Sequence, residues 1–167
     1  MIEVTQTKFI PKGDCYAACI ASIFELDINK LPHLPEDDEI ILQKYPIKNP
    51  EYYGVAESRT QWWYWMWGEW FAANNLMGLK LPSKVLPDQY DRNRLTTYHI
   101  ITGISPRDKE PTPGKTHERH SVVGKHGLIW FDPHPDRTGL LSVDEFEIII
   151  PTDPTKPILQ GYKDAIQ

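Results

Sequence analysis

Helical and strand-like patterns occupy different parts of this chain, and this separation limits the folds that it can adopt. The periodic segments before Pro87 have helical spacing. After Pro87 come short runs rich in β-branched and aromatic residues, which predict strands at 97–104, 119–124, 127–131 and 146–150. Lys125-His126-Gly127 predicts a tight hairpin turn between the second and third runs. Helices followed by successive short strands favour an α+β fold with an antiparallel sheet.

The first helical segment runs from Asp14 to Leu26, with small or apolar residues at positions 15, 18, 19, 22, 23 and 26. Gly13 breaks the preceding chain, and we expect the Asp14 side chain to cap the helix by accepting hydrogen bonds from the first-turn amides. The helix should therefore begin at or near Cys15. Because small residues let other elements approach closely, we expect a central, buried N-terminal helix packed on the sheet.

A second helix is predicted from Gln61 to Asn75, where five of the six tryptophans lie. Four aromatic residues of this segment share one helical face: Trp63, Trp67, Trp70 and Phe71. We expect this stripe to belong to the core, because large aromatic side chains dominate burial. Trp62 and Trp65 lie off the stripe, and Trp62 is a candidate substrate contact. Between the two helices the chain is polar and Pro-rich, with one short helix predicted over 37–44.

The length and charge of the chain exclude several classes of protein. A chain of 167 residues suits one domain with a single hydrophobic core. The net charge of −5 and the scattered basic residues argue against nucleic acid as a partner. No apolar run approaches the roughly 18 residues that span a bilayer, and the N-terminal residues lack the pattern of a secretory signal. We therefore expect a cytoplasmic protein with no membrane partner.

Cys15 is the first candidate for catalysis because it lies at the expected helix start. Peptide dipoles and free amides favour an anion there, so the helix would stabilise a thiolate nucleophile. The expected base is His120, since imidazole exchanges protons near neutral pH. A hairpin turned at 125–127 pairs position 120 with Asp132, close enough for the carboxylate to orient the imidazole. Cys19, one turn later, is expected to be a buried core residue, and two cysteines so close together exclude a disulfide framework.

The order Cys, His, Asp, with the cysteine heading a helix and the others on a later sheet, is the papain-like order. The segments that carry this pattern are Gln6 followed by GDCYAACIASIFEL, then RHSVVGKHGLIWFDPHPDRTG and LSVDEF. They resemble the papain-like cysteine peptidases, and most of all the bacteriocin-processing peptidase domains attached to bacterial ABC exporters. Short bacterial and phage proteins that carry GISPR, RHSVV and DPHP are similar as well. The resemblance covers residues 1–26 and 98–146.

The resemblance implies a single papain-like domain over residues 1–167 that acts as a thiol hydrolase. Its expected parts are the Cys helix (1–26), a helical and loop excursion (27–96), the sheet with His and Asp (97–150) and a tail (151–167). It implies Cys15 as nucleophile, His120 as general base and acid, Asp132 as the orienting residue and Gln6 as an oxyanion donor. The backbone amide of Cys15 is a further oxyanion donor. We expect no cofactor and a peptide, isopeptide or small amide substrate; the residues leave the substrate and the oligomeric state open.

Two alternative functions stay open. The chain could be a catalytically idle papain-like module that binds a host protein or small molecule as an inhibitor, since Trp and Tyr side chains near a cleft also serve recognition. It could instead be a metal-dependent hydrolase, because His117, His120, Asp132 and His134 offer three imidazoles and a carboxylate. Against a metal, residues three apart on a strand point to opposite faces of the sheet.

Two further residues are candidate substrate contacts. His134 lies in the DPHP run after the expected orienting residue, and we expect it to touch the substrate or to support the catalytic residues. Arg107 follows the strand predicted at 97–104 and could bind an anionic group. The alternative for Arg107 is an ordinary solvated arginine.

Overall fold

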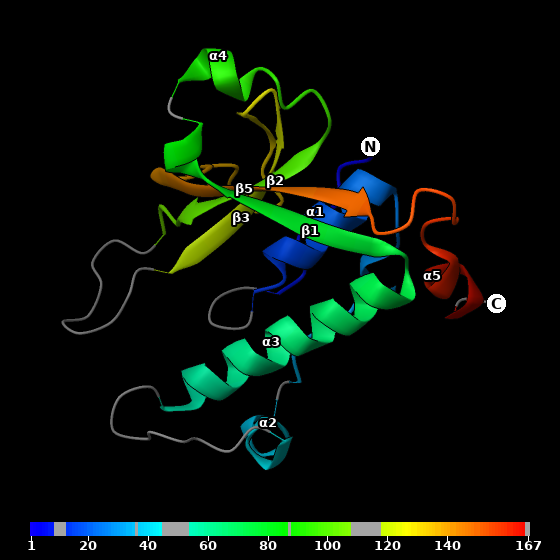
Figure 1. Cartoon of the computed structure of the whole chain (residues 1–167). Coiled ribbons are helices and arrows are strands. Elements are labelled where there is room, and N and C mark those ends of the chain that lie inside the picture. The colour runs from blue at the N-terminus through cyan, green and yellow to red at the C-terminus, as the bar shows by residue number, and fades with distance from the viewer. Residues whose placement is uncertain (9–12, 36, 45–53, 87, 108–117, 166–167) are drawn as a thin grey trace. The chain divides into compact units, whose positions relative to one another are not determined.

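The computed structural model describes residues 1–8, 13–35, 37–44, 54–86, 88–107 and 118–165 (Figure 1). The chain divides into two compact units. Residues 1–31 and 78–150 make up the first unit, and residues 32–77 and 151–167 make up the second. None of the helices in the described part of the chain has both the length and the apolar character needed to cross a membrane.

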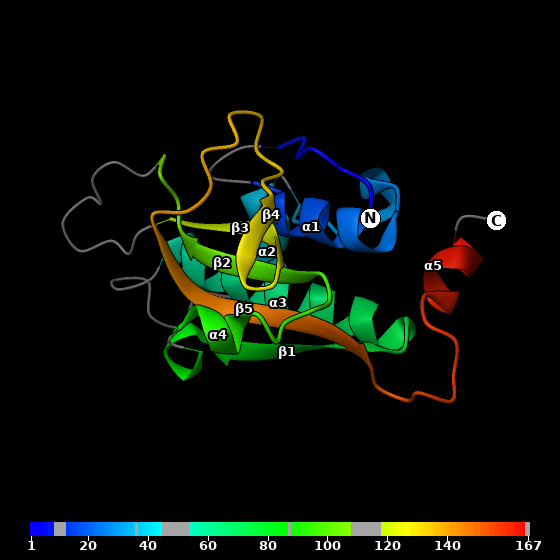
Figure 2. The same ribbon diagram turned by 90° about the horizontal axis from the view of Figure 1, so that it is seen from above.

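A five-stranded antiparallel sheet organises the first unit, with the strand order β1-β5-β2-β3-β4 (Figure 2). The strands are Leu76–Pro82 (β1), His99–Ile104 (β2), Arg119–Lys125 (β3), Leu128–Phe131 (β4) and Ser142–Pro151 (β5). The predicted α+β class is confirmed, and β2, β3 and β4 lie within one or two residues of their predicted bounds. The strand predicted at 146–150 is confirmed as the second half of the longer β5.

Sequence patterns do not indicate β1, because its sequence LMGLKLP contains Gly, Lys and Pro and has no β-branched residue. The strand lies at the edge of the sheet, where it needs only β5 as a neighbour. A Cβ atom at Gly78 would overlap the Glu147 carboxylate of β5, so any larger residue there would force this carboxylate to shift. The tertiary neighbour, rather than local propensity, therefore selects the extended conformation.

Helix α1 spans Cys15–Phe24, so the predicted start at Cys15 is confirmed. Every residue from 16 to 22 is buried, and the helix packs against β3 and β2 (Figure 2). Small side chains dominate this run, which allows the backbone to approach the sheet closely. Among its described residues the first unit also contains the short helices η1 (Ile28–Lys30), η2 (Ser83–Val85) and α4 (Gln89–Arg92).

The hydrophobic core of the first unit centres on Phe146, Ile101 and Val122, which have no exposed surface, together with Leu95. These residues come from β5, β2, β3 and the segment before β2. Partly buried side chains surround them: Leu81, Leu86, Leu140, Val143 and Ile148. The core therefore joins β2, β3 and β5, which are neighbouring strands at the centre of the sheet.

A buried polar pair joins α1 to the sheet. The Tyr16 hydroxyl donates a hydrogen bond of 3.0 Å to Glu147 Oε1, and Glu147 Oε2 has no hydrogen-bond partner among the described residues. Burial raises the pKa of Glu147, although the charge of Lys80 and the hydrogen bond from Tyr16 oppose this. The carboxyl group of Glu147 thus depends on Tyr16 for its hydrogen bonding.

Replacing Tyr16 with phenylalanine is expected to lower the free energy of unfolding at pH 7 by about 1–2 kcal/mol, because Glu147 would stay buried without its donor. The raised pKa of Glu147 gives stability that is present in acid and is lost as the pH rises through the folded-state value. The hydrogen bond from Tyr16 opposes this rise, so its removal should raise the pKa of Glu147 further and destabilise the ionised carboxylate most. The deficit of the variant should therefore be smaller at pH 4 than at pH 7 in urea titrations. The exposed Tyr64→Phe is the control, and a pH-independent deficit would contradict the assignment to Glu147.

The second unit contains α2 (Asp38–Lys44), α3 (Gly54–Ala73) and α5 (Gln160–Ala165). The short helix predicted over 37–44 is confirmed as α2, and the second predicted helix begins earlier, at residue 54 instead of 61. In the predicted aromatic stripe of α3, Trp67 and Phe71 are buried.

The C-terminal segment is held within the second unit by the asparagines that end the predicted helix. Asn74 Oδ1 accepts a hydrogen bond of 2.7 Å from the Tyr162 amide. Asn75 Oδ1 accepts one of 2.9 Å from the Asp153 amide. Helix α5 lies within the part of the chain that the sequence predicts only as a tail.

Candidate active site

The two cysteines occupy different environments on α1. Cys15 is the first residue of the helix, is partly exposed and carries a free thiol. Cys19 is fully buried, and burial raises the pKa of its thiol well above the usual value, with the charges of Cys15 and Asp132 adding to the effect. The prediction of Cys19 as a core residue is confirmed, and Cys15 is the thiol that a reagent can reach.

Asp14 does not cap α1, so that prediction is wrong. Its backbone angles are φ −109° and ψ 26°, which differ from the extended conformation usual for capping residues, and no first-turn amide bonds its side chain. The carboxylate instead accepts hydrogen bonds from the Thr7 amide (3.0 Å), the Thr7 hydroxyl (2.7 Å) and the Lys8 amide (2.9 Å). The first-turn amides at Cys15 are therefore not occupied by Asp14, and residues 7–8 are tied to the helix start.

His120 and Asp132 form the contact that the sequence predicts. Both side chains are buried, and His120 Nε2 lies 2.7 Å from Asp132 Oδ1. His120 is the second residue of β3, and Asp132 directly follows β4, so the hairpin brings them together.

The predicted register of this hairpin is wrong, although the contact is present. The turn residues His126 and Gly127 have φ values of 55° and 68°, which both favour a two-residue hairpin turn. Lys125 therefore pairs with Leu128. An irregularity in the ladder then brings Val123 opposite Phe131, so Asp132 is a diagonal neighbour of His120 and not its direct partner.

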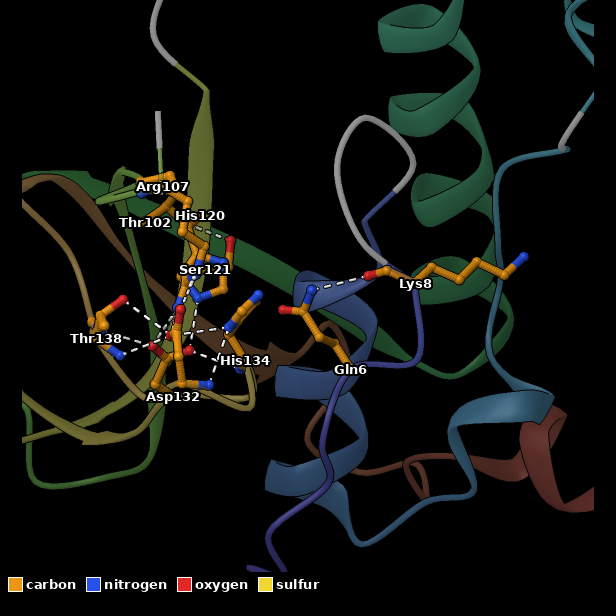
Figure 3. A network of polar contacts seen from close by, with 12 residues as sticks. Gln6, Lys8, Thr102, Arg107, His120, Ser121, Asp132, His134 and Thr138 are labelled. Atoms are coloured by element: carbon orange, nitrogen blue, oxygen red, sulfur yellow. Dashed lines mark hydrogen bonds and ion pairs between the residues drawn. The ribbon is translucent and has the colours of Figure 1, made fainter. Parts of the chain in front are cut away.

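Four donors hold the Asp132 carboxylate (Figure 3). Oδ1 accepts from His120 Nε2 and from the His134 amide at 2.8 Å, and Oδ2 accepts from the Gly139 amide at 2.8 Å and from Arg107 Nη2 at 3.3 Å. Burial alone would raise the pKa of Asp132, but the hydrogen bonds from His120, His134 and Gly139 lower it below the usual value. The carboxylate is therefore ionised and fixed in orientation.

His120 also contacts Cys15. His120 hydrogen-bonds Cys15 as well as Asp132. Nε2 bonds the carboxylate, so Nδ1 is the ring nitrogen that Asp132 leaves available. Burial alone would lower the pKa of His120, but the hydrogen bonds with Asp132 and Cys15 outweigh it and raise the pKa to about 9. At neutral pH the imidazole therefore carries a proton beside the sulfur. Such a pair can attack a carbonyl carbon and then protonate a leaving group.

Gln6 is buried beside these residues. Its backbone amide donates to the Pro133 carbonyl at 3.0 Å, and the next residue, Thr7, is bound by Asp14. Side-chain Nε2 donates to the Lys8 carbonyl at 2.9 Å (Figure 3) and carries a second hydrogen that this bond does not use. Oε1 is buried and has no hydrogen-bond partner among the described residues. The role of Gln6 as an oxyanion donor stays a prediction that depends on the second hydrogen.

Arg107 and His134, both predicted as substrate contacts, meet at Asp136. Arg107 Nε donates to Asp136 Oδ2 at 3.0 Å, and Nη2 contacts Asp136 Oδ1. His134 Nδ1 lies 2.9 Å from Asp136 Oδ1, and the His134 ring is edge-on to His120 at 6.2 Å between centroids. The hydrogen bond from Arg107 holds the pKa of Asp136 well below its usual range.

These contacts change the interpretation of both candidates. The alternative of a solvated Arg107 is wrong, since its side chain is only 17% exposed and bonds two carboxylates. Asp136 does not stand out in the sequence, although it closes the same DPHPD run as His134. A role of Arg107 or His134 in substrate binding stays a prediction.

The remaining candidates belong to the second unit or fall outside the described residues. Trp62 is on α3 in the second unit, where Lys44 Nζ is 5.1 Å from its ring centroid. Its role as a substrate contact stays a prediction. His117, a member of the possible metal set, falls outside the described residues. Within the described ranges, no three His, Cys, Asp or Glu side chains are grouped so as to hold a metal ion.

Comparisons of the chain with protein-family models, with curated proteins and with solved structures found no match.

Proposed function

We propose that the chain is a papain-like thiol hydrolase that cleaves a peptide, isopeptide or other amide bond through a thioester at Cys15. The observation that carries the proposal is the His120 imidazole, which hydrogen-bonds both the Asp132 carboxylate and Cys15. A papain-like fold belongs to the same proposal, because it too has the nucleophile at the start of a buried helix and the His and Asp on a later antiparallel sheet.

The proposed reaction has two halves. The Cys15 thiolate attacks the substrate carbonyl carbon, the His120 imidazolium protonates the leaving nitrogen, and the C–N bond breaks to leave a thioester. Water then attacks the thioester while neutral His120 accepts its proton, and the Cys15 thiolate leaves as the acid product departs. Asp132 keeps the imidazole oriented through both halves.

Donors for the oxyanion are present at the helix start. The Cys15 backbone amide belongs to the first turn of α1, whose amides Asp14 does not cap. The unused hydrogen of Gln6 Nε2 is a second candidate. Removing one such donor commonly costs a few kcal/mol of transition-state stabilisation. Because the Cys15 amide is also a donor, oxyanion stabilisation in the proposed reaction does not depend on Gln6 alone.

Alkylation with iodoacetamide tests the proposal without knowledge of the substrate. At pH 7 we expect Cys15 to react faster than free cysteine. His120→Ala should slow this reaction about tenfold or more, which corresponds to losing about 1.4 kcal/mol of thiolate stabilisation. Peptide mass spectrometry reports modification of Cys15 and Cys19 separately.

The matched control is His126→Asn, which removes an exposed imidazole whose ring hydrogen-bonds the Asn93 carbonyl and keeps a residue that tolerates positive φ. It should leave the alkylation rate unchanged. If Cys15 reacts no faster than free cysteine, or if His120→Ala reacts as fast as the unmodified protein, the hydrolase proposal fails. The catalytically idle binding module then becomes the better interpretation.

A further inference from the structure

The donors to Asp132 come from two sources. The His134 and Gly139 amides belong to the loop that Asp132 itself begins, so they move with the carboxylate. His120, on β3, and Arg107, just beyond β2, lie elsewhere in the chain. Arg107 is thus the contact that fixes Oδ2 from outside the loop, on the side of the carboxylate opposite to His120.

Arg107 is itself held firmly. Its Nε and Nη2 both contact the carboxylate of Asp136, and a planar guanidinium that meets a carboxylate with two nitrogens has a fixed direction. Asp136 is fixed in turn by the amide and the hydroxyl of Thr138, both at 3.1 Å. One guanidinium therefore bridges two carboxylates, and the second carboxylate serves as its anchor.

We infer that Arg107, anchored by Asp136, is a positioning residue that fixes Oδ2 of Asp132 so that Oδ1 stays on His120 Nε2. Arg107 does not touch the sulfur and acts only through Asp132. The inference rests on the proposed function, in which an oriented imidazole is needed. It concerns a residue that the sequence favours only as a substrate contact or a solvated charge.

The sign of one measurement separates positioning from a simple charge effect. The groups that face His120 are Asp132, Cys15 on α1 and the His134 ring, and Arg107 reaches it through Asp132. Removing a cation beside Asp132 would, by charge alone, favour the imidazolium and raise the pKa of His120. Loss of the aligned His120–Asp132 bond would lower that pKa, because this bond is a main reason that it lies at about 9.

The experiment uses Arg107→Lys and Arg107→Gln in the full chain. Lysine keeps the charge but cannot bridge two carboxylates as a planar fork, and glutamine removes the charge as well. NMR titration of the His120 ring should give a midpoint that falls from about 9 toward 6.5 in both variants. Alkylation of Cys15 by iodoacetamide at pH 7 should slow about tenfold to a hundredfold, the usual effect of a misplaced group. The matched control is Arg137→Gln, on the same loop but paired with Glu3 at 3.5 Å, which should change neither readout.

A His120 midpoint that stays constant or rises in both Arg107 variants would overturn the positioning role. This readout needs no reactive thiol, so it decides the inference even if the unmodified protein fails the alkylation test. Fast alkylation that depends on His120, together with an unchanged titration in the variants, would overturn the inference and leave the proposed function standing. If Arg107→Gln does not fold, the charge-conserving Arg107→Lys gives the same decision.

Discussion

Replacing Asp132 with asparagine is expected to lower the free energy of unfolding by about 2–3 kcal/mol at pH 6.5 and by less than about 1 kcal/mol at pH 8.5. The folded-state pKa of His120 is raised to about 9 from an ordinary value of 6.5. A histidine with a raised pKa contributes stability that is complete below the unfolded value and is lost as the pH rises through the folded value. The hydrogen bond with Asp132 is the largest of the contributions that raise this pKa, so the variant should lose mainly stability that depends on pH.

Urea titrations followed by tryptophan fluorescence at the two pH values measure this difference. Comparison with the unmodified protein cancels the Cys19 thiol, whose raised pKa also lowers stability in alkali. Asp144→Asn is the control, because Asp144 is in a half-exposed ion pair with Arg119 at 3.2 Å. Its effect should stay below about 1 kcal/mol at both pH values. An Asp132→Asn deficit of equal size at pH 6.5 and 8.5 would show that the histidine and the carboxylate are not coupled.

Replacing Phe146 with alanine should lower the free energy of unfolding by about 3–5 kcal/mol, the range found when a large buried aromatic is truncated. Phe146 has no exposed surface and lies among Ile101, Val122 and Leu95 in the core. Its ring also meets the edge of the His99 ring at 6.0 Å between centroids. The cavity would open between β5 and the strands that carry the candidate site.

Thermal and urea unfolding measure the effect of Phe146→Ala. Leu141→Ala is the matched control, since Leu141 is a large apolar residue near the start of the same strand with 66% of its surface exposed. Its cost should be within about 0.5 kcal/mol. A Phe146→Ala cost as small as that of the control would mean that the core is not centred on this residue.

Local signals in the sequence were sufficient for the parts of the site that neighbours along the chain determine. The start of α1 at Cys15 follows from the Gly-Asp break and the helical spacing after it. The His120–Asp132 contact follows from a hairpin whose turn residues are visible in the sequence. The contact is predicted correctly in spite of the wrong register, because side chains at diagonal positions of two paired strands can meet as well as those directly opposite.

The remaining parts depend on contacts between distant segments. Asp14 is a residue type that caps helices, but its carboxylate instead accepts hydrogen bonds from three donors of Thr7 and Lys8. The Arg107–Asp136 contact joins residues 29 positions apart, and no periodic pattern relates them. Strand β1 forms beside the buried Glu147, whose carboxylate would have to shift if Gly78 carried a side chain. In each case the deciding partner lies outside the helix or strand that shows the local pattern, so local propensity carries no information about it.

The bonds from Asp14 to Thr7 and Lys8 have a consequence for how this chain can vary. The Asp14 amide also lies 3.4 Å from the Lys8 carbonyl, so residues 8 and 14 are joined at the base of the intervening connection. Gln6 and Cys15 are therefore placed by this closed base and not by the number of residues between them. Changes at Thr7, Lys8 or Asp14 should therefore disturb the placement of Gln6 relative to the start of α1 more than changes at positions that make no contact with this base.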